Sequence, residues 1–77
     1  MASHKVYSCI VSAVRNKKLK EPFTAVDFKK ACPSFGAGTY NAFLHKHAHG
    51  NPGGNSELFE RVRPGAFRLI RPLKYGF

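Results

Sequence analysis

Most of the side chains that could bind a ligand lie in one stretch, 39–49. The spacing of its apolar residues predicts a helix that ends at Gly50. At about 100° per residue, one side of this helix collects small, polar and basic side chains: Asn41, Ala42, His45, Lys46 and His49. The amide of Asn41 matches adenine in the major groove, Lys46 or His45 can donate to guanine, and Ala42 allows close approach. A single exposed Asn or Lys on a helix is most often simply solvated. Taken as a set, however, this face is a candidate for contact with base edges.

The histidines of the same stretch also suggest a metal site. His45 and His49 are four residues apart and could pair on a zinc ion from one helical face. Two histidines without a third ligand nearby make a weak site, so we expect no metal and no other cofactor. Histidine gains charge below pH about 6.5, and anion binding by this face should therefore strengthen on mild acidification.

The charge needed to hold phosphates is spread along the chain. Thirteen Lys and Arg against four Asp and Glu give a formal charge of 13 − 4 = +9, which predicts a polyanionic partner. The candidate phosphate contacts are polar residues near the start of the 39–49 helix, helix-end lysines and hairpin arginines: Ser34, Thr39, Lys17, Lys18, Lys29, Lys30, Arg61, Arg63 and Arg68. Lys17 and Lys18 also lie where a helix dipole favours cations without any ligand.

Size and composition exclude several classes of protein. Seventy-seven residues allow one domain, with a core of about 4–70 and a tail of 71–77. A hydrophobic content of 43% is too high for a disordered basic tail, and no apolar run is long enough for a membrane. Cys9 and Cys32 lie on apolar stripes and are expected to be free, buried thiols of a soluble intracellular protein, cytoplasmic, nucleoid or nuclear. Four carboxylates leave little for acid–base work, so we expect a binding protein and not an enzyme.

Three helices must position the candidate residues. The first runs from His4 to about Lys17, and a short extended piece with Phe23 as a buried residue follows it. The second is opened by Thr24, whose capping box uses Asp27, and is closed by Cys32-Pro33. Its inward residues are expected to be Val26, Phe28 and Ala31. The tight turn 34–38 leads to the third helix, with an inward side of Tyr40, Phe43, Leu44 and His47.

A hairpin completes the predicted fold. The segment 51–56 holds two glycines and a proline and is expected to be an irregular, mobile connector. Two strand candidates, 58–62 and 66–70, lie on either side of a predicted turn, Arg63-Pro64-Gly65. Proline fixes its own φ for the turn, and glycine can adopt a positive φ.

This order of elements is the layout of a small α+β winged helix-turn-helix domain, three helices followed by a two-stranded β-hairpin wing. The segments 38–44 and 58–69 resemble the HARE-HTH modules of restriction endonucleases and chromatin proteins, with a T-x-N-x-x-L-like segment and a wing of the form F-x-x-V-x-x-G-x-[FY]-x-L. The resemblance implies a DNA-binding or DNA-sensing module. This chain departs from the pattern in having Ala37-Gly38 where the family usually has Thr-Pro, and in its long joint, 50–56.

The sequence therefore favours double-stranded DNA binding by a transcriptional or chromosomal regulator or a recognition module, with helix 39–49 in the major groove. The alternative is a protein-interaction module whose basic faces meet an acidic partner, with the apolar tail residues Leu73, Tyr75 and Phe77 as docking anchors. RNA binding is a third hypothesis, but the hairpin offers no broad aromatic sheet for stacking bases.

Overall fold

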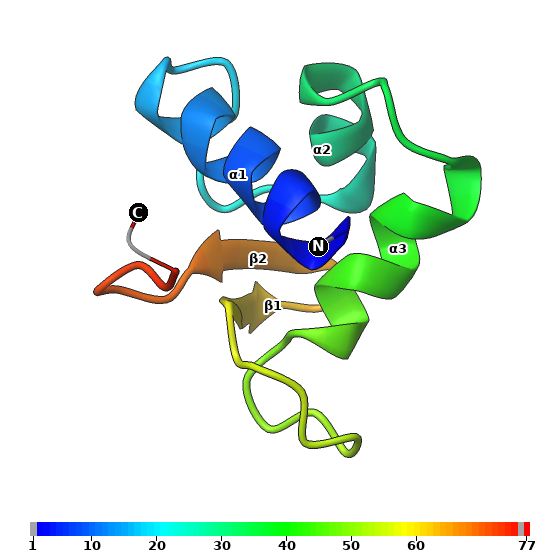
Figure 1. Ribbon diagram of the computed structural model, residues 1–77, viewed down its shortest axis with the longest axis vertical. Coiled ribbons are helices and arrows are strands. Elements are labelled where there is room, and N and C mark those ends of the chain that lie inside the picture. The colour runs from blue at the N-terminus through cyan, green and yellow to red at the C-terminus, as the bar shows by residue number, and fades with distance from the viewer. Residues whose placement is uncertain (1, 76) are drawn as a thin grey trace.

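The computed structural model describes residues 2–75 and residue 77, with side chains from Lys5 onward. Three helices, α1 (Ala2–Arg15), α2 (Ala25–Ala31) and α3 (Ala37–Lys46), precede an antiparallel pair, β1 (Phe59–Arg63) and β2 (Ala66–Leu69). Figure 1 shows α1 and α2 over one side of the hairpin and α3 beside them. This is the predicted α+β order of elements. All five elements bury side chains in one core, to which the largest contributors include Tyr7, Phe28, Leu44, Phe59 and Phe67.

The end of α1 has an unusual backbone. Lys17 has a φ of 61°, which places it in the left-handed region that glycine normally occupies after a helix. The amide of Lys17 donates to the Val14 carbonyl at 3.1 Å, and the amide of Lys18 donates to the Ala13 carbonyl at 2.8 Å. These bonds satisfy carbonyls at the helix end and turn the chain sharply toward α2.

Helix α2 confirms the predicted capping box and corrects one core residue. The Thr24 amide donates to Asp27 Oδ2 at 3.0 Å, and the Asp27 amide donates to Thr24 Oγ1 at 3.2 Å. Phe28 is fully buried and Ala31 packs partly against the core, as predicted. The prediction for Val26 was wrong, since it is 62% exposed. Side chains two positions apart in a helix point about 200° away from each other, so Val26 and Phe28 cannot both face the core.

The extended piece after α1 joins the hairpin. Phe23 forms a bridge with Phe67, in which each amide donates to the other residue's carbonyl at 2.8 Å. In the hairpin itself, Phe59 lies opposite Leu69 and Arg61 opposite Phe67. The pairing shifts between Arg61 and Arg63, and Gly65 takes the positive φ, 78°, that was predicted for the turn. Phe59 of β1 also forms a bridge with Ala48, so the candidate functional hairpin is fixed to the body from both of its edges.

The two cysteines are joined by a disulfide, so the expectation of free thiols was wrong. Cys9 comes from α1 and Cys32 is the residue that caps the end of α2. Their Cα atoms are 6.3 Å apart, within the range that a disulfide spans. Cys9 lies on the core side of α1, as predicted, whereas Cys32 follows the last residue of α2. The periodicity of single helices does not reveal that these two side chains meet. The link ties α1 to the start of the turn before α3.

The C-terminal tail packs onto the body of the protein. The Lys74 amide donates to the Tyr7 hydroxyl at 3.0 Å, and the Tyr7 and Phe77 rings meet edge to face at 5.5 Å. Arg15 donates to the Phe77 carbonyl. Leu73 and Phe77 are partly buried against the core, whereas Tyr75 is 42% exposed and lies against Tyr7. Two of the three side chains suggested as docking contacts for an acidic partner are therefore already used internally.

Glu21 connects the turn after α1 to the end of β2. Its carboxylate accepts hydrogen bonds from the Leu69 amide at 2.7 Å and from Arg71 at 2.8 and 3.0 Å. The Arg71 hydrogen bonds, opposed by partial burial and assisted by the Leu69 amide, lower the pKa of Glu21. The charged form of Glu21 is therefore stabilised by folding.

Replacing Glu21 with alanine is expected to lower the free energy of unfolding at pH 7 by about 2 kcal/mol, because a charged acceptor is lost and a backbone amide loses its partner. The pKa of Glu21 is lower in the folded chain than in the unfolded chain, where it is about 4.3. This stabilisation is thus complete above that value and is lost as pH falls through the folded pKa. Denaturant unfolding of wild type and Glu21→Ala should give curves that converge in acid. Glu60→Ala, which removes an exposed ion pair with Arg68, is the control and should change stability by less than about 0.5 kcal/mol.

No helix in the described part of the chain is long and apolar enough to cross a membrane.

Candidate nucleic-acid interface

The angle between α2 and α3 is held by the hydroxyl of Tyr40. This side chain is buried, and its hydroxyl accepts from the Phe35 amide at 3.1 Å. The same hydroxyl lies within hydrogen-bonding distance of the Cys32 and Phe35 carbonyls. The Tyr40 ring packs edge to face on Phe28 of α2 at 4.8 Å. One side chain of α3 thus fixes both the turn and the neighbouring helix, and it determines which face of α3 meets solvent.

The burial of α3 follows the predicted helical period. Tyr40, Phe43 and Leu44 face the core, as does His47 at the helix end. The opposite side, which we call the α3 face, presents Asn41, Ala42, His45 and Lys46 to solvent. The predicted separation into a buried and an exposed side is confirmed over these positions. No Asp or Glu occurs in α3.

His49 does not belong to the α3 face. The helix ends at Lys46, His47 caps it with a φ of −110°, and the His49 amide then donates to the Phe59 carbonyl at 2.7 Å. Its side chain pairs with Glu57 at 3.1 Å. A helix as far as His49 was predicted because Gly50 is a strong helix terminator, but the bridge of Ala48 to Phe59 of β1 competes with the last turn. His45 and His49 therefore share no helical face, and no group of three or more metal-binding side chains forms among the described residues.

The hairpin meets the α3 face at Arg61. Its Nη2 lies 3.1 Å from Nδ1 of His45, and its guanidinium carbon lies 5.6 Å from the centre of the Phe67 ring. The rings of His45 and Phe67 also meet edge to face at 5.6 Å. Arginine can only donate hydrogen bonds, so His45 Nδ1 is the acceptor in this contact. The buried Phe67 thus supports one residue of the helix and one residue of the hairpin side by side.

The other hairpin arginines differ from each other. Arg63 is exposed at the end of β1, next to the turn. Arg68 lies opposite Glu60 in the register, and its Nε donates to Glu60 at 2.6 Å. Side chains alternate across a strand, so Arg61 and Phe67 share one face of the hairpin whereas Glu60 and Arg68 share the other. Arg68, which was predicted as a phosphate contact of the hairpin, thus lies on the other face from Arg61 and is paired with Glu60.

The residues predicted near the start of α3 lie close to its first turn. The helix begins at Ala37, two residues before the predicted start, so Thr39 is its third residue and is partly buried. The Thr39 amide donates to the Gly36 carbonyl at 2.9 Å. Gly36 occupies the cap position and offers no side-chain hydrogen bond, and Ser34 is exposed in the turn before it.

The predicted lysines do not gather at the α3 face. Lys29 and Lys30 are exposed in the last turn of α2, and Lys17 and Lys18 are exposed after α1. Three of them, Lys17, Lys18 and Lys30, line a separate surface hollow of about 310 Å³. In Figure 1 the end of α1 lies at the upper left and α3 at the right. The positive charge of the molecule is therefore divided between two regions.

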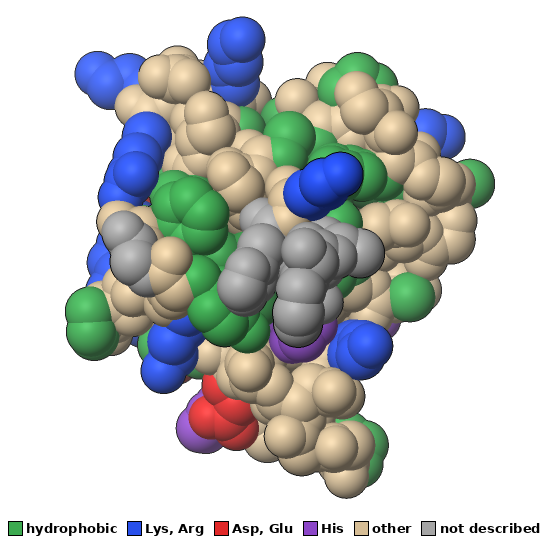
Figure 2. Space-filling view, in the orientation of Figure 1, with side chains coloured by type: hydrophobic (Ala, Val, Ile, Leu, Met, Phe, Trp, Pro, Cys, Tyr) green, Lys and Arg blue, Asp and Glu red, His purple; other side chains and the backbone are tan. Residues whose placement is uncertain are grey.

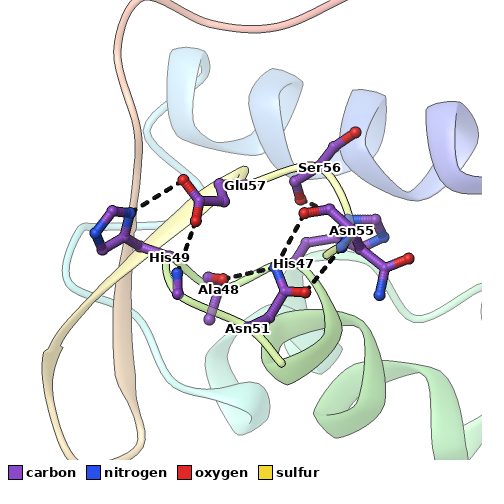
Figure 3. A network of polar contacts seen from close by, with 8 residues as sticks. His47, Ala48, His49, Asn51, Asn55, Ser56 and Glu57 are labelled. Atoms are coloured by element: carbon purple, nitrogen blue, oxygen red, sulfur yellow. Dashed lines mark hydrogen bonds and ion pairs between the residues drawn. The ribbon is translucent and has the colours of Figure 1, made fainter. Parts of the chain in front are cut away.

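The loop between α3 and β1 is held by its own side chains (Figure 3). Asn51 Nδ2 donates to the Ala48 and Asn55 carbonyls, each at 3.0 Å, and Asn51 Oδ1 accepts from the Asn55 amide at 2.9 Å. His47 Nδ1 lies 2.8 Å from the Ser56 carbonyl and must donate to it. The loop has no regular structure, as predicted, but it is tied down and is not a free connector. Asparagine commonly bonds to nearby backbone, and this signal was present in the sequence.

Glu57 closes the same loop from its far end. Its Oε2 accepts from the Gly50 amide at 2.8 Å, and its Oε1 lies 3.1 Å from His49. The Gly50 amide and then His49 lower the pKa of Glu57. His49 is thus engaged in loop closure, which accounts for its position away from the α3 face.

A scan against protein-family models finds no match for this chain, and searches of curated proteins and of solved structures find no similar protein.

Proposed function

We propose that this chain is a winged helix-turn-helix domain that binds double-stranded DNA. In this proposal the α3 face enters the major groove, with Asn41 and Lys46 directed at base edges. Arg61 and Arg63 of the hairpin bind the backbone or the minor groove. The single observation that carries the proposal is the contact of Arg61 with His45, because it joins the hairpin to the side of α3 that is free of carboxylates.

The distribution of negative charge supports the same function. Each of the four carboxylates has an internal partner: Glu21 with Arg71, Asp27 with the Thr24 amide, Glu57 with His49 and Glu60 with Arg68. None of these groups lies on the α3 face. A phosphate backbone that approaches this face therefore meets cations and hydrogen-bond donors without a competing anion.

Duplex binding is expected to depend steeply on salt and on the α3 face. If about five phosphates are neutralised, the slope of log K against log salt should be near −4.5. The double variant Asn41→Ala, Lys46→Ala should weaken binding by about tenfold or more, because base contacts of this kind contribute roughly 1–3 kcal/mol. Fluorescence anisotropy with a labelled duplex at several salt concentrations measures both effects, and circular dichroism checks the fold.

The matched control is Lys5→Ala, Asn55→Ala, which removes one lysine and one asparagine outside the α3 face and the hairpin. It should retain most of the wild-type affinity. A salt response that is flat, or equal losses in the two double variants, would contradict DNA binding through α3.

A further inference from the structure

The surface hollow at the corner of α1 and α2 is lined mainly by cations. Four lysines reach it from the end of α1, the following turn and α2, and we call it the lysine hollow: Lys17, Lys18, Lys20 and Lys30. Leu19, Pro22 and Asp27 complete its lining. Asp27, its one carboxylate, already accepts the Thr24 amide in the capping box. No ion pair of the described residues involves any of the four lysines.

Helix dipoles account for only part of this cluster. A cation in the last turn of a helix interacts favourably with the helix dipole. This interaction accounts for the position of Lys30 in α2 and of the lysines directly after α1. Lys20 lies beyond that turn. Four like charges around one hollow of about 310 Å³ also repel each other, and this repulsion is relieved when an anion occupies the space between them.

The backbone at Lys17 accounts for the gathering of three of these lysines. With a φ of 61°, this residue adopts a conformation that costs a lysine more than a glycine. The conformation directs the chain so that Lys17, Lys18 and Lys20 all line the same space.

The lysine hollow is remote from the α3 face. Figure 1 places the end of α1 and α3 on opposite sides of a molecule that measures 28 × 26 × 24 Å. Figure 2, in the same orientation, shows Lys and Arg side chains gathered over the end of α1 at the upper left. We therefore expect a duplex along α3 to leave the α1 side of the hollow open.

We propose that the lysine hollow is a second phosphate-binding site and that it takes the backbone of a second DNA duplex, so that one chain bridges two DNA segments. The identity of the occupant rests on the proposed function. Several ammonium groups from two helices suit a polymer with closely spaced phosphates better than a single anion, because each phosphate neutralised releases counterions. The α3 face would already hold the chain where such a polymer is concentrated.

Bridging is tested by capture of a fluorescent duplex on beads that carry a second duplex, with the wild-type chain added in limiting amount. The variant Lys17→Gly, Lys20→Ala should reduce capture by about tenfold through the loss of two phosphate contacts, while its affinity for one duplex in solution changes less than about threefold. Lys5→Ala, Lys74→Ala removes the same charge elsewhere and should capture as wild type does. Glycine suits the positive φ of position 17, so the double variant should melt no lower than wild type, which excludes misfolding as the cause of a loss. Equal capture by the hollow variant and wild type would overturn the proposal.

Amide chemical-shift mapping separates this proposal from the function of α3. The variant Asn41→Ala, Lys46→Ala is titrated with an unlabelled duplex and, separately, with tripolyphosphate. Shifts at Lys17, Lys18, Lys20 and Lys30 with the duplex would support the hollow as a duplex site. If the α3 face of the wild type does not respond as well, the proposed function fails and bridging is overturned with it. Shifts at the four lysines with tripolyphosphate but not with the duplex would overturn the duplex as occupant, and an absence of shifts with both would overturn the site.

Discussion

Replacing Cys9 and Cys32 together by alanine is expected to lower the free energy of unfolding by about 3 kcal/mol. The disulfide links positions 23 residues apart, and a loop of this length restricts the unfolded chain substantially. The total stability of a small domain is only about 5–15 kcal/mol, so the melting temperature should fall by roughly 15 °C. Thermal unfolding followed by circular dichroism measures the change.

The reductant provides the control for this prediction. Wild type treated with a phosphine reductant should lose stability to a similar extent, whereas the double alanine variant should not respond. The loss should be greatest around the turn before α3, because Cys32 caps α2 and its carbonyl lies against the Tyr40 hydroxyl. Faster amide exchange at Phe35 would report this loosening. Identical melting of oxidised and reduced wild type would show that the link contributes nothing.

The triple variant Lys46→Ala, Arg61→Ala, Arg63→Ala is expected to weaken duplex binding by about 100-fold at low salt, at roughly 1 kcal/mol for each charged contact. The slope of log K against log salt should fall by about 3 if all three cations contact phosphate, and by less if Lys46 contacts a base. The effect follows from the contact of Arg61 with His45, which puts Arg61 beside the α3 face, and from the exposure of Arg63 two residues further along β1. Anisotropy titrations at four salt concentrations provide both numbers.

A variant with the same loss of charge distinguishes this face from general attraction. Lys5→Ala, Arg68→Ala, Lys74→Ala also removes three cations, but Arg68 lies on the other side of the hairpin and is paired with Glu60. We expect it to bind the duplex within about threefold of wild type, because distant exposed charges are largely screened. If the two triple variants lose affinity equally, net charge and not the α3 face governs binding.

The parts of the fold that could be predicted depend on neighbours in sequence. The capping box of Thr24 and Asp27, the end of α2 before Pro33 and the turn at Gly65 are all determined within a few residues. The exposed side of α3 was predicted because core burial repeats every 3.6 residues along a helix. Most of the α3 face could therefore be predicted from the sequence.

The features that could not be predicted depend on contacts between distant segments. Arg61 and His45 are 16 residues apart and meet only because β1 bridges back to the residues after α3. The Cys9–Cys32 link likewise requires two helices to pack at one particular register. Arg68 is different, because strand alternation alone would have separated it from Arg61. Val26 is a similar case, since a helical wheel of α2 excludes it from the side that Phe28 occupies.

The first and last residues of the loop between α3 and β1 are hydrogen-bonded to each other. The His49 amide donates to the Phe59 carbonyl at 2.7 Å, and the Leu58 amide donates to the His47 carbonyl at 2.8 Å. These bonds hold the two ends of the loop together, so the length of the segment between them does not influence how β1 is aligned with β2. Residues inserted at Gly53 would cost little entropy, since doubling a loop costs only about 0.6 kcal/mol. The domain could thus accept a peptide epitope or a fluorophore attachment point at this position without altering the geometry of its hairpin.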